Sequence, residues 1–294
     1  MAPTLSGMSV FAVLAELWDR VAGTQPVPPT PVVAGSGIVA LLVVLNTRAW
    51  HLARNAITIA HEGGHALVSL LSGRRLAGIR LHSDTSGETV SRGRRTGPGV
   101  VLTAFAGYVT PSLLGAGAAY LLAAHHVILL LWLFLVLLGA TFLAIRNWYG
   151  VLAVLVTAGV VCAVTWLAAA SLQAAFGYGA AWFLLFGGVR PVAELYRSRS
   201  RSRRRGRPLW SDADALARLT GVPGGVWVAV FGLVAVAALV IGARLLIPGP
   251  LHVPHFRLRP RRPAMPVRPR QVPLVRTPVS SMRASISAGS AYTR

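Results

Sequence analysis

Long apolar segments recur along the chain and constrain its fold more than any other feature. About seven of them approach the length of a membrane-spanning helix, which needs roughly 20 residues to cross the hydrocarbon core. Only 13% of the residues are charged and 54% are hydrophobic, which excludes an ordinary soluble domain. The sequence therefore predicts an all-α polytopic membrane protein with about six to seven transmembrane helices. The segments lie near residues 32–45, 53–71, 100–123, 127–145, 149–172, 175–196 and 226–246.

The segments at either end of the chain differ from this membrane-embedded domain, which we place at residues 32–247. Residues 1–31 have neither the basic N-terminal region nor the clear cleavage site of a signal peptide. We expect a segment that is partly amphipathic instead. Residues 248–294 are rich in Pro and Arg and contain no acid, a composition typical of disorder.

Residues 74–95 have a different character from the apolar segments on either side of them. Polar and apolar residues alternate, β-branched residues are frequent, and residues 84–87 (Asp-Thr-Ser-Gly) carry a turn signal. We predict a small β-hairpin at the membrane surface, with a basic surface loop as the alternative. A strand edge beside a catalytic site can hold an extended peptide as an added strand.

The basic residues are all Arg, and their positions predict a topology. Residues 197–207 form the densest run, within a segment 197–224 that we interpret as a cytoplasmic loop followed by a short helix. The positive-inside rule places this run and the hairpin in the cytoplasm, and the even number of helices predicted between them agrees. The N-terminus is then inside, whereas the basic tail falls outside, against the rule. Anionic lipids are the partners expected for the Arg clusters. The position of these clusters beside the membrane already explains their charge, so no nucleic acid is expected as a partner.

The second apolar segment carries the motif His61-Glu62-Gly63-Gly64-His65. Positions i and i+4 of a helix share one face, so His61 and His65 can bind the same metal ion. Glu62 projects beside them, where it can accept a proton from a water molecule. The alternative is a pair of helix histidines satisfied by neighbouring polar groups. It is disfavoured because a Glu and two His are costly in an apolar helix without a strong partner.

A catalytic zinc site usually has three protein ligands, so the fold must supply one more. Residues 211–223 predict a short helix, in which Ser211 is the N-cap, Asp214 completes a capping box, and a Gly and a Pro end it. Capping explains Asp214 better than it explains Asp212. We therefore predict Asp212 as the third ligand, with Asp214 as the substitute. His51 is a further candidate. The remaining candidates have simpler roles in solvated loops, helix junctions or ion pairs: Asp84, Glu88, Glu194, His82, His125 and His126.

A polar break between two apolar segments holds Asn147. Its side-chain amide could donate a hydrogen bond to a substrate carbonyl or to an oxyanion. The alternative is an interfacial turn with an aromatic anchor, which is common where membrane helices end.

Four stretches of the chain together resemble the M50 family of membrane metalloproteases. They read HEGGHALVSLLSGRRLAGIRL from residue 61, GPGVVLTAFAGYVTPSLLG from residue 97, IRNWYG from residue 145 and SDADALARLTGVP from residue 211. The resemblance covers about residues 45–246. Within the family, the sequence is most similar to the M50B-like branch of actinobacterial type, which is related to site-2 proteases. It implies that His61 and His65 are zinc ligands and that Glu62 is the catalytic base.

One departure from site-2 proteases concerns the third ligand. Those enzymes carry it in an Asp-Gly motif within a later membrane helix, and this sequence contains no Asp-Gly. The resemblance implies that the segment beginning at Ser211, which is characteristic of the M50B-like branch, supplies the third ligand instead.

The predicted function is therefore that of a zinc-dependent intramembrane endopeptidase in a bacterial plasma membrane. Its substrate would be a membrane protein whose spanning helix unwinds locally, so that the backbone reaches the site. A catalytically inactive scaffold or regulator that keeps the fold is the first alternative. A transporter with His and Asp along an ion path is the second. The sequence leaves the oligomeric state open.

Overall fold

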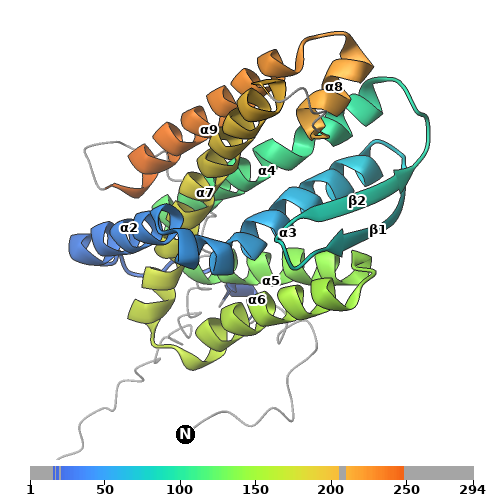
Figure 1. Ribbon diagram of the computed structural model, residues 1–294. Helices are drawn as coiled ribbons and strands as arrows, with labels where there is room; N and C mark the ends of the chain where they lie inside the picture. Colours follow the sequence, from blue (N-terminus) through green and yellow to red (C-terminus); the bar gives the residue numbers. More distant parts are fainter. Residues whose placement is uncertain (1–15, 17, 20, 205–209, 248–294) are drawn as a thin grey trace, which may run out of the picture. The chain divides into compact units, whose positions relative to one another are not determined.

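The computed structural model describes residues 16, 18, 19, 21–204 and 210–247 (Figure 1). Most of the predicted N-terminal segment and the whole of the predicted disordered tail lie outside the described residues. In chain order the elements are α2 (Thr30–Leu45), α3 (Thr47–Leu71), β1 (Arg75–Leu81), β2 (Gly87–Arg92), α4 (Pro98–Ala123), α5 (Val127–Ala144), α6 (Trp148–Leu167), α7 (Ala170–Arg204), α8 (Asp212–Thr220) and α9 (Gly224–Leu246).

The described helices confirm an all-α polytopic membrane protein. Five of them, α4 to α7 and α9, are long and apolar enough to cross a membrane. Helices α2 and α3 pass the same test only together, as one span bent by 102°. The first two predicted spans thus count as one at most, because α2 has only 16 residues. Helix α7 is longer than predicted, since the Arg-rich segment expected as a loop continues it to residue 204.

The bend between α2 and α3 lies at Asn46. The side chain of Asn46 accepts a hydrogen bond from the backbone N–H of Ala49 at 3.0 Å and so caps α3. The break frees carbonyls at the end of α2, and the guanidinium of Arg190 on α7 donates to the one at Val44. The same guanidinium lies 4.7 Å from the centre of the Trp50 ring. Side chains therefore satisfy backbone groups that the break between the two helices would otherwise leave unpaired.

Helix α4 packs against α3, α7, α8 and α9. It therefore lies against both the helix of the HExxH motif, α3, and the helix that begins at Asp212, α8. The contact with α3 depends on Gly64 of the HExxH motif, because a Cβ there would lie 2.2 Å from Oγ1 of Thr110. Small residues at such contacts let membrane helices approach closely. The missing side chain of Gly64 thus allows the close approach of α3 and α4.

The predicted hairpin forms, and Figure 1 shows its two strands running beside α3. Strands β1 and β2 pair antiparallel, with Arg75 opposite Arg92 at the base and Leu81 opposite Gly87 near the turn. The turn at residues 82–86 is closed by a bond from the N–H of His82 to the carbonyl of Ser86 at 2.8 Å. This outcome excludes the surface-loop alternative.

The two edges of this hairpin differ. The outer edge of β1 meets the junction of α5 and α6, where Ile79 bridges to Ile145 in parallel. The amide of Asn147 accepts from the N–H of Leu81 at 3.1 Å and donates to its carbonyl at 2.7 Å. No described strand pairs with the outer edge of β2. The junction of α5 and α6 thus holds the outer edge of β1, whereas the outer edge of β2 pairs with no described strand.

Candidate metal centre

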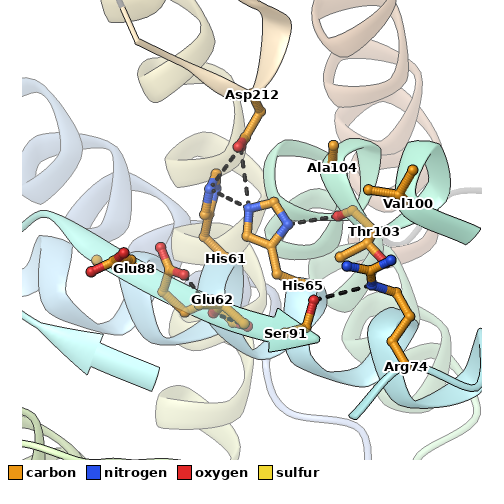
Figure 2. Close-up of a pocket in the computed structure, with 12 residues that line it drawn as sticks. His61, Glu62, His65, Arg74, Glu88, Ser91, Val100, Thr103, Ala104 and Asp212 are labelled. Atoms are coloured by element: carbon orange, nitrogen blue, oxygen red, sulfur yellow. Dashed lines mark hydrogen bonds and ion pairs between the residues drawn. The ribbon is translucent and has the colours of Figure 1, made fainter. Parts of the chain in front are cut away.

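The HExxH motif lies in the middle of α3, and its two imidazoles face the same side as helical spacing requires (Figure 2). The Nε2 atoms of His61 and His65 are 3.2 Å apart, and the rings meet edge to face at 82°. The Nδ1 of His65 lies 2.6 Å from the carbonyl oxygen of Thr103 on α4. Because a carbonyl only accepts, Nδ1 carries a hydrogen, so Nε2 is the nitrogen that would present a lone pair to a metal ion.

Helix α8 brings the third side chain to this point. Oδ2 of Asp212 lies 3.1 Å from Nε2 of His61 and 3.2 Å from Nε2 of His65. One ligand atom from each of these three residues fits within a span of 4.8 Å. Burial alone would raise the pKa of the Asp212 carboxyl, but the hydrogen bonds to the two imidazoles outweigh it and hold that pKa below its usual range. The carboxylate is therefore ionised, as a metal ligand must be.

The substitute candidate Asp214 has other partners. Its carboxylate accepts hydrogen bonds from the Arg199 guanidinium and from the Ser211 hydroxyl, each at 2.5 Å. Ser211 precedes α8 as predicted, but its hydroxyl makes no capping bond to the backbone. The predicted capping box is thus wrong in detail, because the Ser211 hydroxyl donates to the acid that the box required. Asp214 fastens α8 to α7, and Asp212 is left to face the histidines.

The space beside the imidazoles is kept open by a glycine of α4. A Cβ at Gly107 would lie 2.3 Å from Nε2 of His65 and 2.6 Å from Nε2 of His61. No side chain larger than hydrogen fits there while the ligand atoms keep their positions. The open space, the two imidazoles and the carboxylate suit a zinc ion, which favours three such ligands and one open position in catalytic sites.

Glu62 is 4% exposed and lies against strand β2. The hydroxyl of Thr89 donates to Oε2 of Glu62 at 2.6 Å and lies 3.1 Å from the backbone carbonyl of the same residue. A Cβ at Gly87 would lie 2.6 Å from Oε1 of Glu62, so the strand passes as close as its backbone allows. The hairpin therefore sets the orientation of this carboxylate.

A cavity of about 300 Å³ connects these groups. Figure 2 shows Glu62 and Glu88 on one side of His65 and the guanidinium of Arg74 on the other. The cavity is lined by residues of α3, β2, α4 and α8 and by one from the turn before β1: His61, Glu62, His65, Arg74, Gly87, Glu88, Thr89, Ser91, Val100, Thr103, Ala104 and Asp212.

The comparison with known families fits this geometry. A family model described as Peptidase M50B-like matches residues 34–242. The chain belongs to this family. The M50B-like chain is therefore a member of a peptidase family, and its five long apolar helices are those of a membrane protein. No curated protein and no solved structure matches it.

Other candidates from the sequence do not reach the centre of the M50B-like site. Asn147 is not among the residues that line the cavity, and both ends of its amide are bound to Leu81. Glu194 pairs with Arg190 four residues earlier, at 2.9 Å, and also lies 3.5 Å from Arg54. Of the remaining candidates only Glu88 lines the cavity, and it is exposed.

Sequence reasoning missed the groups that surround the motif. Thr103 and Gly107 are four residues apart and therefore share a face of α4. This spacing of a polar and a small residue within an apolar segment was the signal that could have placed them beside the motif. Thr89 and Arg74 carry no comparable signal, because only the docking of the hairpin on α3 brings them to the site.

Proposed function

We propose that the protein is a zinc-dependent intramembrane endopeptidase, similar to site-2 proteases, in a bacterial plasma membrane. The observation that carries the proposal is the meeting of His61, His65 and Asp212 around an open space, with Glu62 beside it. The histidines and the aspartate are about 150 positions apart in the chain. Local helix structure does not bring them together, so their meeting supports a shared metal ion.

His61, His65 and Asp212 would hold the ion, with the Thr103 carbonyl fixing the tautomer of His65. When bound there, zinc would polarise a substrate carbonyl and make water a stronger nucleophile at neutral pH. The other parts of the reaction belong to side chains of the protein.

Glu62 would act as the base and then the acid. Its carboxylate accepts the proton of the attacking water and delivers it to the amide nitrogen as the peptide bond breaks. The Thr89 hydroxyl binds Oε2 and so restricts the carboxylate to one orientation. The hydrogen bond engages only one of the two carboxylate oxygens.

The substrate would be a membrane protein whose helix unwinds locally at the site. An unwound backbone inside a membrane needs new hydrogen-bond partners, and the unpaired edge of β2 offers them. Thr89 lies on this strand beside Glu62, so a peptide added along β2 would pass the catalytic carboxylate.

Anionic lipid headgroups are the partners that we propose for the exposed Arg residues at the hairpin base. Arg75 lies opposite Arg92 in the register, and like charges in that position repel each other. Arg94 and Arg95 follow and are also exposed. Anionic headgroups at the cytoplasmic surface would offset this repulsion.

The first test is metal content of the full chain purified in detergent, measured by mass spectrometry. We expect about one zinc per chain, and less than about half would count strongly against the proposal. The second test is Glu62→Gln, which should retain zinc but reduce cleavage of co-expressed single-span membrane proteins by about 10²–10⁴-fold. Glu88→Gln, which removes an exposed carboxylate of the same cavity, is the matched control and should retain most activity.

A cellular phenotype would separate a protease from a scaffold. If deletion of the gene has a phenotype that Glu62→Gln fully complements, the protein acts as a scaffold or regulator and the catalytic proposal is wrong. If the variant fails to complement while its zinc content and abundance are unchanged, the peptidase activity is the function.

A further inference from the structure

Arg74 is the one cationic side chain among the described residues that line the cavity, apart from the histidines. It lies between α3 and β1 and is half-buried. Its Nε donates to the Ser91 hydroxyl at 3.1 Å, and its Nη1 donates to the Arg94 carbonyl at 2.6 Å. The guanidinium is therefore held in place before any substrate arrives.

The guanidinium keeps donors for another partner. It has five N–H groups in a planar fork, and these two bonds engage two of them. A carboxylate is the group that best matches such a fork, because it accepts two parallel charge-assisted hydrogen bonds. Within the part of the chain that the structure describes, no ion pair or hydrogen bond joins Arg74 to the acids of the same cavity, Glu62, Glu88 and Asp212.

The spacing along β2 relates Arg74 to the proposed catalytic base. Thr89 contacts Glu62, and Ser91 contacts Arg74. These two strand residues are two positions apart and lie on the same face, since side chains alternate along a strand. At about 3.3 Å per residue, the two contact points are separated by about 7 Å along the strand. A peptide added to the edge of β2 would have the same repeat.

We propose that Arg74 is a specificity-determining residue that binds a carboxylate of the substrate about two residues from the bond that is cleaved. This assignment rests on the proposed peptidase function and names a substrate feature for it. The ligand is an Asp or Glu side chain within the substrate strand. A free C-terminal carboxylate has the same chemistry and is distinguished in the test. The strand direction decides on which side of the cleaved bond the acid lies.

The experiment uses the full chain in detergent with a set of host peptides of Leu, Ala and Gly. In each peptide one position carries Asp, Asn or Lys, and each is made with a C-terminal acid and with a C-terminal amide. Cleavage products are identified and timed by mass spectrometry. The wild type should cleave the peptides with Asp at one position near the bond about tenfold or more faster than those with Asn. That ratio is the one expected for a single hydrogen bond between charged groups.

Charge reversal separates recognition from a structural role of Arg74. Arg74→Glu should lose the preference for Asp and gain one for Lys at the same position, which a simple loss of hairpin structure would not produce. Arg75→Glu is the matched control, because Arg75 is the exposed neighbour that does not line the cavity; it should keep the preference for Asp. An equal preference in Arg74→Glu and wild type would overturn the assignment.

The failure of this assignment and that of the peptidase function are distinguishable. Cleavage with no preference for an acid at any position overturns the role of Arg74 and leaves the peptidase proposal intact. A preference only for the free C-terminal acid assigns Arg74 to chain ends and overturns the internal side chain. If no peptide is cleaved although zinc is bound, the peptidase proposal fails. Affinities of fluorescent Asp and Asn peptides for Glu62→Gln then decide the role of Arg74: tighter binding of Asp supports it, and equal binding overturns it.

Discussion

Gly107 stands so close to His65 that a Cβ at position 107 would lie 2.3 Å from Nε2 of the imidazole. Real Cβ atoms essentially never approach another heavy atom so closely, so a side chain would have to displace the ring. The ring is not free to move, because its Nδ1 is bound to the carbonyl of Thr103 on the same helix as Gly107. Helix α4 thus both orients this histidine and leaves space beside it.

We expect Gly107→Ala to remove most of the bound zinc. The added methyl would force apart the imidazoles of His61 and His65, the two nitrogen ligands. Zinc per chain after purification, measured by mass spectrometry, should fall below about one fifth of the wild-type value. Gly117→Ala on the same helix has no atom within 4 Å of the new Cβ and should bind zinc normally. Full zinc occupancy in Gly107→Ala would show that the ion lies elsewhere.

The two acids of α8 should respond differently to removal. Asp212→Ala deletes the carboxylate that lies 3.1 Å and 3.2 Å from the two imidazoles, so zinc should be lost. Asp214→Ala deletes the partner of Arg199 and should leave zinc in place, while the free energy of unfolding falls by about 1–3 kcal/mol. Zinc content and the thermal unfolding midpoint in detergent measure the two effects. Zinc loss confined to Asp214→Ala would make Asp214 the ligand instead.

A double-mutant cycle completes this comparison. Arg199→Gln in the Asp214→Ala background should cost little more than either single change, because the two side chains act as one contact. Additive losses would mean that each residue stabilises α8 through separate contacts.

The parts of the site that lie close together in the chain could be predicted from the sequence. His61, Glu62 and His65 share one helix, and their relative placement follows from helical spacing alone. The ends of α8 were also predictable, because Gly221 adopts the left-handed conformation that commonly ends a helix. In the same way, the alternation of residues 74–95 was sufficient for the hairpin.

The parts that depend on tertiary packing could not be predicted. Asp212 was predicted over Asp214 from a capping box that does not form; the contact that engages Asp214 comes from Arg199 of another helix, which no local pattern marks. The amide of Asn147 binds Leu81, which is 66 residues away, instead of facing a substrate. The break at Asn46 coincides with the end of the first predicted segment at residue 45, but no local signal fixes the 102° angle between α2 and α3.

Asn147 should act through the hairpin. Replacing it with Ala leaves the N–H and the carbonyl of Leu81 without this partner, at a cost of about 1–3 kcal/mol for buried groups. We expect faster hydrogen exchange over residues 75–92 with zinc content unchanged. Asn147→Asp can still accept from the N–H of Leu81 and should lie between wild type and Ala. A direct role at the oxyanion predicts the opposite pattern, namely a lower kcat with unchanged hairpin exchange.

Thr89→Val should separate the orientation of the catalytic carboxylate from its presence. Val has nearly the shape of Thr but cannot donate the 2.6 Å hydrogen bond to Oε2 of Glu62. We expect kcat to fall about tenfold, less than the about 10²–10⁴-fold loss for removal of a base. Thr89→Ser restores the hydroxyl and should recover most of the rate, which a packing role of the methyl group would not allow. Zinc content should be equal in all three proteins, since Thr89 touches none of the proposed ligands. Initial rates at saturating substrate give kcat; an unchanged kcat in Thr89→Val would mean that β2 holds Glu62 through its backbone alone.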